Sequence, residues 1–287
     1  MGRTVLARDM PPVPGGIPTD AQTVTELAAH VTRQLADVTP ATLAGLTDHT
    51  TLKPTDTPGT LDTHLTDTLL EPFTPYAVCV TPDYAADAVM RLSGTGVAVA
   101  SVAGAFPHGR TLETVRQTEI DAVLDAGVDE LDIVLDRALY LSGAYDAAFD
   151  KISWVRDACN RYTAQDGKSR RIKLILETGE LPDLAAIAHA AWLSLHAGAD
   201  MVKTATGTIP EGATPEAVLT IAHTVDAFNR MYDKTRGIKI SGGVATVADA
   251  TLYYTLTKSV WGDAANNPLR LRFGASRLLA ALRTKGT

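Results

Sequence analysis

Two lysines stand inside short apolar runs of strand length: Lys203 in MVKTATG and Lys239 in GIKISGG. Their neighbours Val202, Ile238 and Ile240 suit a face packed against helices, so strand alternation turns both lysines to the opposite, inner face. Burial and the proximity of a like charge both disfavour an ammonium group, and the resulting neutral amine is the nucleophile that forms a Schiff base with a carbonyl. The alternative is that each lysine only pairs with a buried carboxylate. The presence of two such lysines, with acids nearby, favours covalent carbonyl chemistry.

Acidic residues occupy similar places in other apolar runs. Asp132 interrupts ELDIVLD on the inward face, where a neighbouring lysine would keep it ionised and let it relay a proton through water. Asp48, in LTDHTTLKP, ends the first run and could bind a substrate hydroxyl, orient a lysine or simply form a turn. Glu177 in LETG is a candidate electrostatic partner of Lys203. Lys173 lies early in RIKLILETG, and we expect a structural role there.

Glycines follow the last three apolar runs, in TATGT, SGGV and FGAS. Glycine lets backbone N–H groups approach an anion, and the helix predicted for SRLLAALR would add the positive end of its dipole. The late strands of a barrel commonly supply a phosphate site, although each glycine could also serve only its turn. The residues concerned are Gly207, Gly242, Gly243 and Gly274 to Ser276.

Composition argues against several other functions. The chain of 287 residues is 45% hydrophobic and 21% charged, which is typical of a folded globular protein. A formal net charge of -7 and the lack of a membrane-spanning apolar run predict neither a nucleic-acid nor a membrane partner. The seven histidines show no spacing typical of metal ligands, so no metal is predicted. Two isolated cysteines and no recognisable signal peptide indicate reduced thiols and a cytoplasmic location.

One recurring unit would position these residues, an apolar β-branched run followed by a longer amphipathic segment. Segments such as TLETVRQTEIDAVLDAG show helical periodicity and stop at glycine. Eight such alternations with short connections predict an α/β protein, a single (β/α)8 TIM barrel of parallel strands. The alternative fold is an open doubly wound sheet. It typically has a Gly-rich turn after its first strand, and TDHTTLKP lacks one. The strands are predicted to begin near Gly45, Tyr76, Gly96, Glu130, Ile172, Met201, Gly237 and Arg270.

The chain ahead of the barrel has a different character. Residues 1–20 carry four of the fifteen prolines and no sustained period, which predicts an irregular N-terminal arm. A helix is predicted over Ala21–Ala36, with Leu35 on its apolar face. No linker divides the remainder, so residues 21–287 are predicted to form one barrel domain, with a polar surface loop at Asn160–Arg171.

Together these motifs resemble deoxyribose-phosphate aldolase, a family of lysine-dependent class I aldolases on a TIM barrel. The resemblance rests on TDHTTLKP, VCVTP, AGAFPHG, GVDELDIVLD, KLILETGEL, GADMVKTATG, KISGGVAT and RFGASRLL, in the family's order from about Leu46 to Leu279. It implies reversible cleavage of 2-deoxy-D-ribose 5-phosphate to acetaldehyde and D-glyceraldehyde 3-phosphate. It also implies no dissociable cofactor, sugar-phosphate and aldehyde ligands, and a homodimer as the commonest assembly.

The resemblance implies a role for each candidate residue. Lys203 would form the Schiff base, Lys239 would perturb it, and Asp132 would relay the proton. The implied substrate-binding residues are Asp48, Cys79 and Thr206, and the implied phosphate-binding residues are Gly207, Gly242, Gly243, Gly274, Ala275 and Ser276. Cys79 would also be able to add to an unsaturated aldehyde, unless it is only a small buried hydrophobe.

Three features depart from the family's pattern. Many members carry arginine after GG(V/I), where this chain has Ala245, and some carry lysine after TxTG, where it has Thr208. The phosphate pocket would then rely on backbone amides and Arg277, so we expect a weaker preference for phosphorylated substrates. Some members end in a tyrosine that assists proton transfer. This sequence ends in LRTKGT, so that assistance is expected to be absent or supplied differently.

Two other functions remain open at this point. One is a Schiff-base barrel aldolase that takes a ketone donor, which a survey of donors would separate. The other is a barrel that binds sugar phosphates without catalysis. Two costly buried lysines speak against the second, because pure binding would not require them.

Overall fold

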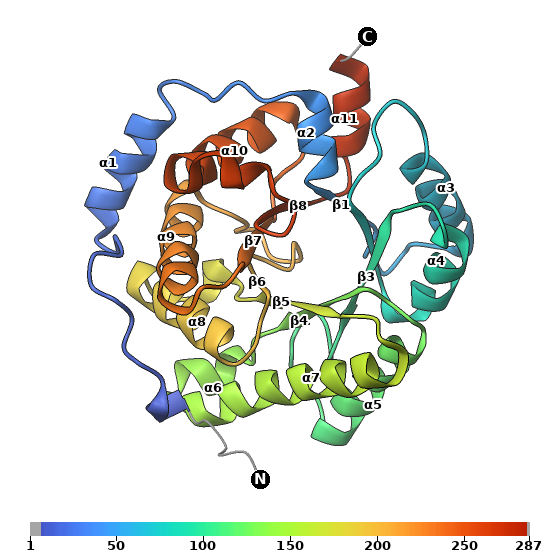
Figure 1. Ribbon diagram of the computed structural model, residues 1–287, viewed down its shortest axis with the longest axis horizontal. Helices are drawn as coiled ribbons and strands as arrows, with labels where there is room; N and C mark the ends of the chain where they lie inside the picture. Colours follow the sequence, from blue (N-terminus) through green and yellow to red (C-terminus); the bar gives the residue numbers. More distant parts are fainter. Residues whose placement is uncertain (1–6, 286–287) are drawn as a thin grey trace.

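The protein is a closed barrel of eight parallel strands surrounded by helices, seen in a computed structural model that describes residues 7–285 (Figure 1). Each strand pairs with the next, and the last pairs with the first, which confirms the predicted TIM barrel. Every strand begins within two residues of its predicted start. The strands are β1 (Thr47–Thr50), β2 (Ala77–Val80), β3 (Ala98–Ala103), β4 (Glu130–Val134), β5 (Arg171–Ile175), β6 (Met201–Lys203), β7 (Gly237–Ser241) and β8 (Leu271–Ala275).

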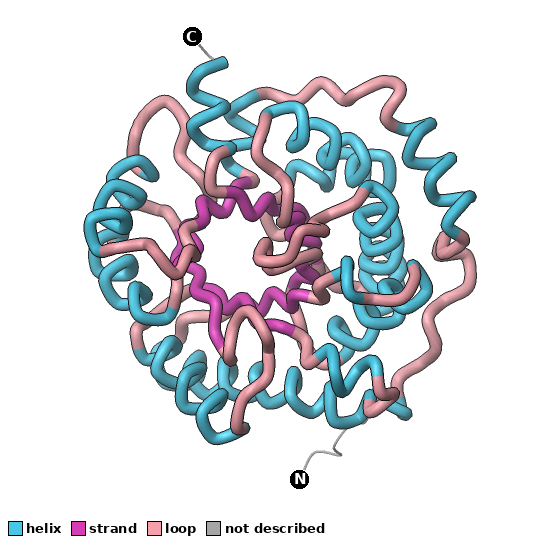
Figure 2. Tube along the Cα trace, turned by 180° about the vertical axis from the view of Figure 1, so that it is seen from behind, coloured by secondary structure: helices cyan, strands magenta, loops and turns pink. Residues whose placement is uncertain are grey.

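Helices form a ring outside the strands, so the barrel has one inner and one outer packing layer (Figure 2). Short polar caps start several of them; at the helix that follows β7, Thr246 and Asp249 form a capping box. The helices are α1 (Ala21–Val31), α2 (Pro40–Gly45), α3 (Pro58–Thr68), α4 (Ala85–Leu92), α5 (Glu113–Asp125), α6 (Arg137–Leu141), α7 (Tyr145–Asp166), α8 (Leu184–His196), α9 (Pro215–Tyr232), α10 (Val247–Trp261) and α11 (Leu278–Lys285).

Strand register brings the charged inner residues to neighbouring places. Lys203 on β6 lies opposite Lys239 on β7, and Asp132 on β4 lies opposite Lys173 on β5. The outward neighbour Val202 is fully buried in the main hydrophobic core between the strands and the helices. The predicted alternation therefore holds at these strands, with an apolar outer face and a charged interior.

The N-terminal arm has little regular structure apart from a short 3-10 turn at Ala7–Asp9, and residues 1–6 lie outside the described part. It runs along the outside of α8 and α9 (Figure 1). There Trp192 Nε1 donates to the carbonyl of Pro11 at 2.7 Å, and Thr220 Oγ1 donates to the carbonyl of Pro18 at 3.3 Å. The arm is thus fastened to the barrel wall, and a domain boundary at residue 21 stays a prediction.

Two predicted boundaries are wrong. Helix α1 ends at Val31 and not at Ala36, and Leu35, expected on its apolar face, is 48% exposed. The loop predicted at Asn160–Arg171 is mostly helix, because α7 continues to Asp166 and ends at Gly167 in the left-handed conformation, with φ 76°. Polar composition suggested a loop there, but Tyr162, bonded to Asp125 at 2.9 Å, packs this stretch onto the neighbouring helix.

No helix between Ala7 and Lys285 combines the length and the hydropathy that a bilayer crossing needs.

Replacing Gly237 with alanine should destabilise the barrel by about 1–3 kcal/mol, because overpacking forces the backbone to shift. An added Cβ would lie 2.6 Å from the carbonyl oxygen of Arg270 and 2.7 Å from that of Leu269. The matched control is Gly59→Ala in helix α3, where the nearest atom would be 3.7 Å away. There we expect about 0.5 kcal/mol of stabilisation. Urea unfolding of both variants measures the difference, and equal free energies of unfolding would contradict the prediction.

Candidate active site

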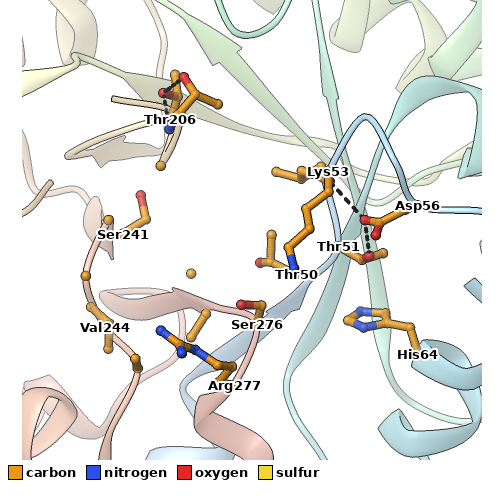
Figure 3. A pocket seen from close by; sticks show the side chains of 18 of the residues that line it. Thr50, Thr51, Lys53, Asp56, His64, Thr206, Ser241, Val244, Ser276 and Arg277 are labelled. Atoms are coloured by element: carbon orange, nitrogen blue, oxygen red, sulfur yellow. Dashed lines mark hydrogen bonds between the residues drawn. The ribbon is translucent and has the colours of Figure 1, made fainter. Parts of the chain in front are cut away.

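A cavity of about 590 Å³ opens at the carboxyl ends of β1, β6, β7 and β8 (Figure 3). This is the end of the barrel where such folds carry their sites. Lys203, the last residue of β6, and Ser241, the last residue of β7, both line it. The other predicted residues that line it are Thr206, Gly207, Gly242, Gly243, Gly274, Ala275 and Ser276. Asp132, Lys239, Asp48 and Cys79 do not line the cavity and are buried in the barrel interior.

Asp132 is the centre of the buried charges. Its Oδ2 accepts hydrogen bonds from Lys203 Nζ and Lys239 Nζ, both at 2.8 Å. Its Oδ1 accepts from Lys173 Nζ, also at 2.8 Å. One carboxylate from β4 therefore binds three lysine side chains from β5, β6 and β7, and of these three only Lys203 lines the cavity.

Two further carboxylates complete the interior. Asp48 pairs with Lys239 at 2.7 Å, with Lys173 at 3.3 Å and with Arg272 at 2.6 Å. Glu130 pairs with Lys173 at 2.6 Å and with Arg272 at 3.0 Å. The Arg272 guanidinium also lies 3.5 Å from the centre of the Tyr76 ring, a close cation–π contact. Lys173 thus has the structural ion pairs that its place early in β5 predicted.

The interior contains one more potential cation than anion. Three lysines and Arg272 face three carboxylates, all of them buried. An uncompensated charge in this setting is costly, and a lysine can remove it by losing a proton. A neutral amine on one lysine therefore balances the interior.

Among the three interior lysines, Lys203 is the one whose pKa is lowered. Burial lowers the pKa of Lys203, the Lys239 ammonium lowers it further, and Asp132 offsets these effects only in part. Burial also acts to lower the pKa of Lys239, but Asp132 and Asp48 together raise it above its ordinary value. The difference follows from geometry, because Lys239 has Asp48 as a second carboxylate partner and Lys203 does not. Burial would raise the pKa of Asp132, but Lys173, Lys203 and Lys239 hold it well below its usual range.

Asp48 lies deeper than its place at the end of the first run suggested. It is fully buried and its contacts are with cations, so the geometry supports the alternative that it orients a lysine. Its substrate-binding role stays a prediction.

Cys79 is fully buried, with its Sγ 3.8 Å from Asp132 Oδ2. Burial raises the pKa of the thiol, although the nearby lysines act to lower it. A high pKa disfavours the thiolate that addition to an aldehyde would require. The surroundings support the interpretation as a small buried hydrophobe, packed with Ala100 and Val102.

Glu177 was predicted to pair electrostatically with Lys203, but among the described residues its ion-pair partner is Arg137 and no ion pair joins it to Lys203. Its carboxylate accepts from the Thr206 amide at 3.1 Å and from the Thr206 hydroxyl at 2.5 Å. On its other side, Arg137 Nη1 lies 3.7 Å away. Glu177 has φ 57° and ψ 65°, the left-handed region that a non-glycine residue seldom adopts. Sequence proximity to a strand end did not reveal this backbone turn, which aims the side chain at the β6 loop.

The loops after β7 and β8 present hydrogen-bond donors to the cavity. Within residues 7–285, the backbone amides of Gly243, Val244, Ser276 and Arg277 have no hydrogen-bond partner. Three of these four residues are not glycine, so the glycines in the sequence predict only part of this set of donors. Arg277 has no carboxylate partner in the described chain, and its side chain adds a positive charge.

Lys53 is a second cation in the cavity, and the sequence reasoning missed it. It extends from the β1 loop into the space around Ser276 (Figure 3). Asp56 holds that loop, accepting from Thr51 Oγ1 at 2.6 Å and from the Lys53 amide at 2.9 Å. One feature of the sequence could have predicted Lys53. It stands in LKP, directly after the first strand, and functional residues of a barrel lie at the carboxyl ends of its strands.

Fold and site together define a parallel β/α barrel in which a buried lysine of lowered pKa lines a cavity. The chain belongs to the DeoC/LacD family of aldolases, whose profile matches residues 43–283. This confirms the family that the motifs predicted. Among the residues described, no group of three or more His, Cys, Asp or Glu side chains could hold a metal ion.

Two curated relatives and one solved structure illustrate the similarity. The chain is 36% identical to the deoxyribose-phosphate aldolases of Homo sapiens and Bos taurus over 207 residues. These matches cover 71% of this chain and 62% of each relative, so the chain spans less than two thirds of their length. A tetrameric deoxyribose phosphate aldolase from Aeropyrum pernix superposes with a TM-score of 0.70 at 25% identity. That match covers 93% of this chain and 99% of the other.

The reactivity of Lys203 should depend on its charged neighbours in opposite directions. Labelling of Lys203 by acetic anhydride should rise with pH through a midpoint below the ordinary lysine pKa of 10.5, because the neutral amine reacts. Lys239→Met removes a cation and should move this midpoint to higher pH. Asp132→Asn removes the anion that favours the ammonium and should move it to lower pH.

Competitive labelling followed by peptide mapping measures these midpoints, with exposed Lys234 as the internal reference for reagent strength. If both variants moved the midpoint in the same direction, the prediction would be wrong. General loosening of the barrel, and not local charge, would then control the reactivity of Lys203.

Proposed function

We propose that this protein is a class I aldolase that reversibly cleaves 2-deoxy-D-ribose 5-phosphate to acetaldehyde and D-glyceraldehyde 3-phosphate. The observation that carries the proposal is Lys203, a buried amine of lowered pKa that alone among the three interior lysines lines the cavity. Membership in the DeoC/LacD family and the names of the relatives support the choice of reaction.

In the condensation direction, Lys203 Nζ adds to the carbonyl carbon of acetaldehyde, and loss of water gives an iminium. Asp132, 2.8 Å from Lys203, accepts an α-proton through water, and the electron pair of the C–H bond forms the enamine. The enamine carbon then attacks the carbonyl carbon of D-glyceraldehyde 3-phosphate, and the oxygen of that carbonyl takes back, through water, the proton that Asp132 had accepted. Water hydrolyses the new iminium, releases the sugar phosphate and restores the amine. Lys239 remains an ammonium throughout and lowers the pKa of the Lys203 amine, which favours its neutral form.

The phosphate group of the substrate would bind between the loops after β7 and β8. The support is the set of unpaired amides there, together with the Lys53 ammonium and the Arg277 guanidinium. Charge-assisted hydrogen bonds from these groups suit a phosphate dianion. Lys53 thus supplies one positive charge to a pocket that lacks cations at Thr208 and Ala245. Lys53 would thus offset part of the weaker preference for phosphorylated substrates that Thr208 and Ala245 predict.

We further propose that the protein works in the cytoplasm as a homo-oligomer. The Aeropyrum pernix relative is tetrameric, which supports self-association in this fold. Cys79 and Cys159 are both buried and unbridged, as expected in a reducing compartment.

Borohydride reduction in the presence of acetaldehyde should add a two-carbon group to Lys203. The expected result is a single adduct by intact mass, located at Lys203 by peptide mapping and lost in Lys203→Met. Acetone and dihydroxyacetone, tested in parallel, should give no more than traces. An adduct with a ketone alone would replace the proposed donor, and no adduct on the folded protein would refute the aldolase.

Lys53→Met and Arg277→Met should each raise KM for the phosphorylated sugar by about 10- to 100-fold, which corresponds to the loss of one charge-assisted hydrogen bond. Activity on unphosphorylated 2-deoxyribose should change much less. Lys234→Met, an exposed residue in the loop before β7 at the opposite end of the barrel, controls for net charge. Equal losses on both sugars would place the two cations outside phosphate recognition.

A further inference from the structure

We propose that Glu177, which does not line the cavity, sets the direction of the hydrogen bonds in the loop after β6, so that Thr208 accepts a hydrogen bond from a hydroxyl group of the substrate. The inference rests on the proposed function, because it concerns how the same cavity recognises a hydroxylated phosphate ester. It makes Glu177 a positioning residue that acts through Thr206, and Thr208 a specificity residue.

The direction follows from counting protons. Thr206 has one hydroxyl proton, and it is donated to Glu177 Oε2 at 2.5 Å. Toward Thr208, the Thr206 oxygen therefore has only lone pairs. The two threonine hydroxyl oxygens lie 2.8 Å apart, a distance that needs a proton between them. That proton must come from Thr208.

Thr208 therefore presents lone pairs to the cavity that it lines. The backbone amides nearby are also occupied, since the Thr206 amide donates to Glu177 and the Thr208 amide donates to Thr206 Oγ1 at 3.2 Å. The loop after β6 is consequently poor in donors at these two residues. A phosphate oxygen, which is an acceptor, finds no proton at Thr208, whereas a hydroxyl group can donate to it.

The loops after β7 and β8, on another side of the cavity, have the opposite polarity. The unpaired amides after β7 and β8, with Lys53 and Arg277, present donors. A sugar phosphate carries acceptors at its phosphate and donors at its hydroxyl groups. The two sides of the cavity therefore match the two ends of such a ligand, and Glu177 supplies this polarity on the β6 side.

The position of Glu177 is fixed by its backbone conformation and by neighbouring residues outside the cavity. Its left-handed backbone turns the carboxylate toward β6, and the Thr178 amide donates to the Thr204 carbonyl at 2.9 Å, which ties the two loops together. Arg137 lies 3.7 Å from the carboxylate and is itself fixed by Glu180 at 2.7 Å. A carboxylate in this position can only accept from Thr206.

Glu177→Gln tests the proposal with almost no change of shape. The new amide can accept from the Thr206 backbone and donate to Thr206 Oγ1, which reverses the chain of hydroxyl groups and frees the Thr208 proton for the cavity. Thr208→Val removes the hydroxyl and keeps the side-chain volume. Glu180→Gln is the matched control, because it changes an acid on Arg137 without touching Thr206.

The probes are sn-glycerol 3-phosphate, which carries hydroxyl groups, and n-propyl phosphate, which has none. Isothermal titration calorimetry on the full chain measures their binding without turnover. Glu177→Gln and Thr208→Val should each weaken binding of glycerol 3-phosphate by about three- to tenfold, the effect of one hydrogen bond. Propyl phosphate should bind Thr208→Val as it binds the unmodified protein, and Glu177→Gln as tightly or more tightly. Glu180→Gln should change neither affinity.

The double variant gives the decisive comparison. If Glu177 acts through Thr208, Glu177→Gln adds nothing to Thr208→Val, whereas independent effects would multiply. Equal weakening of both probes in Glu177→Gln would mean that the loop has only lost its structure, and unchanged affinities would mean that no hydroxyl binds there. Either result overturns the proposal. Borohydride trapping on the unmodified protein tests the aldolase separately, so failure there is distinguishable from failure of the hydroxyl site.

Discussion

The interior of this protein depends on the carboxylate of Asp132, which three lysine side chains share. Without this anion, three ammonium groups would face one another inside the barrel, where charges are poorly solvated. Asp48 and Glu130 extend the arrangement to Arg272, and together they leave one positive charge unbalanced. The lowered pKa of Lys203 is therefore a property of the whole cluster and not of one residue.

The barrel makes this cluster possible because six different strands contribute to it. Charged side chains point inside from β1, β4, β5, β6, β7 and β8, while outward residues such as Val202 are buried under the helices. A closed sheet holds these strands in fixed register, so long side chains meet at hydrogen-bond distance with little freedom to separate. The cavity lies at the carboxyl ends of these strands, and of the three lysines in the cluster only Lys203 lines it.

The sequence predicted the side chains whose direction follows from strand periodicity. It did not predict the contacts that depend on the conformation of a loop. Alternation was sufficient to turn Lys203, Lys239 and Asp132 inward, because neighbouring apolar residues left them no other face. The partner of Glu177 depended on a left-handed turn that no local pattern signals. Lys53 was missed for a similar reason, since its side chain enters the cavity through the path of a loop and not through strand alternation. The length of α7 depended on contacts with a neighbouring helix.

The unbalanced positive charge has a consequence for carbon acidity. A Schiff base at Lys203 would be positively charged in its iminium form. Loss of the N–H proton would remove this charge, but the neutral imine that results no longer activates the adjacent carbon. The same repulsion from Lys239 that lowers the pKa of the amine would act on this iminium. Loss of a proton from the adjacent carbon gives a neutral enamine and removes the repulsion. The charge arrangement that frees the nucleophile would thus also acidify the carbon next to the bond it forms.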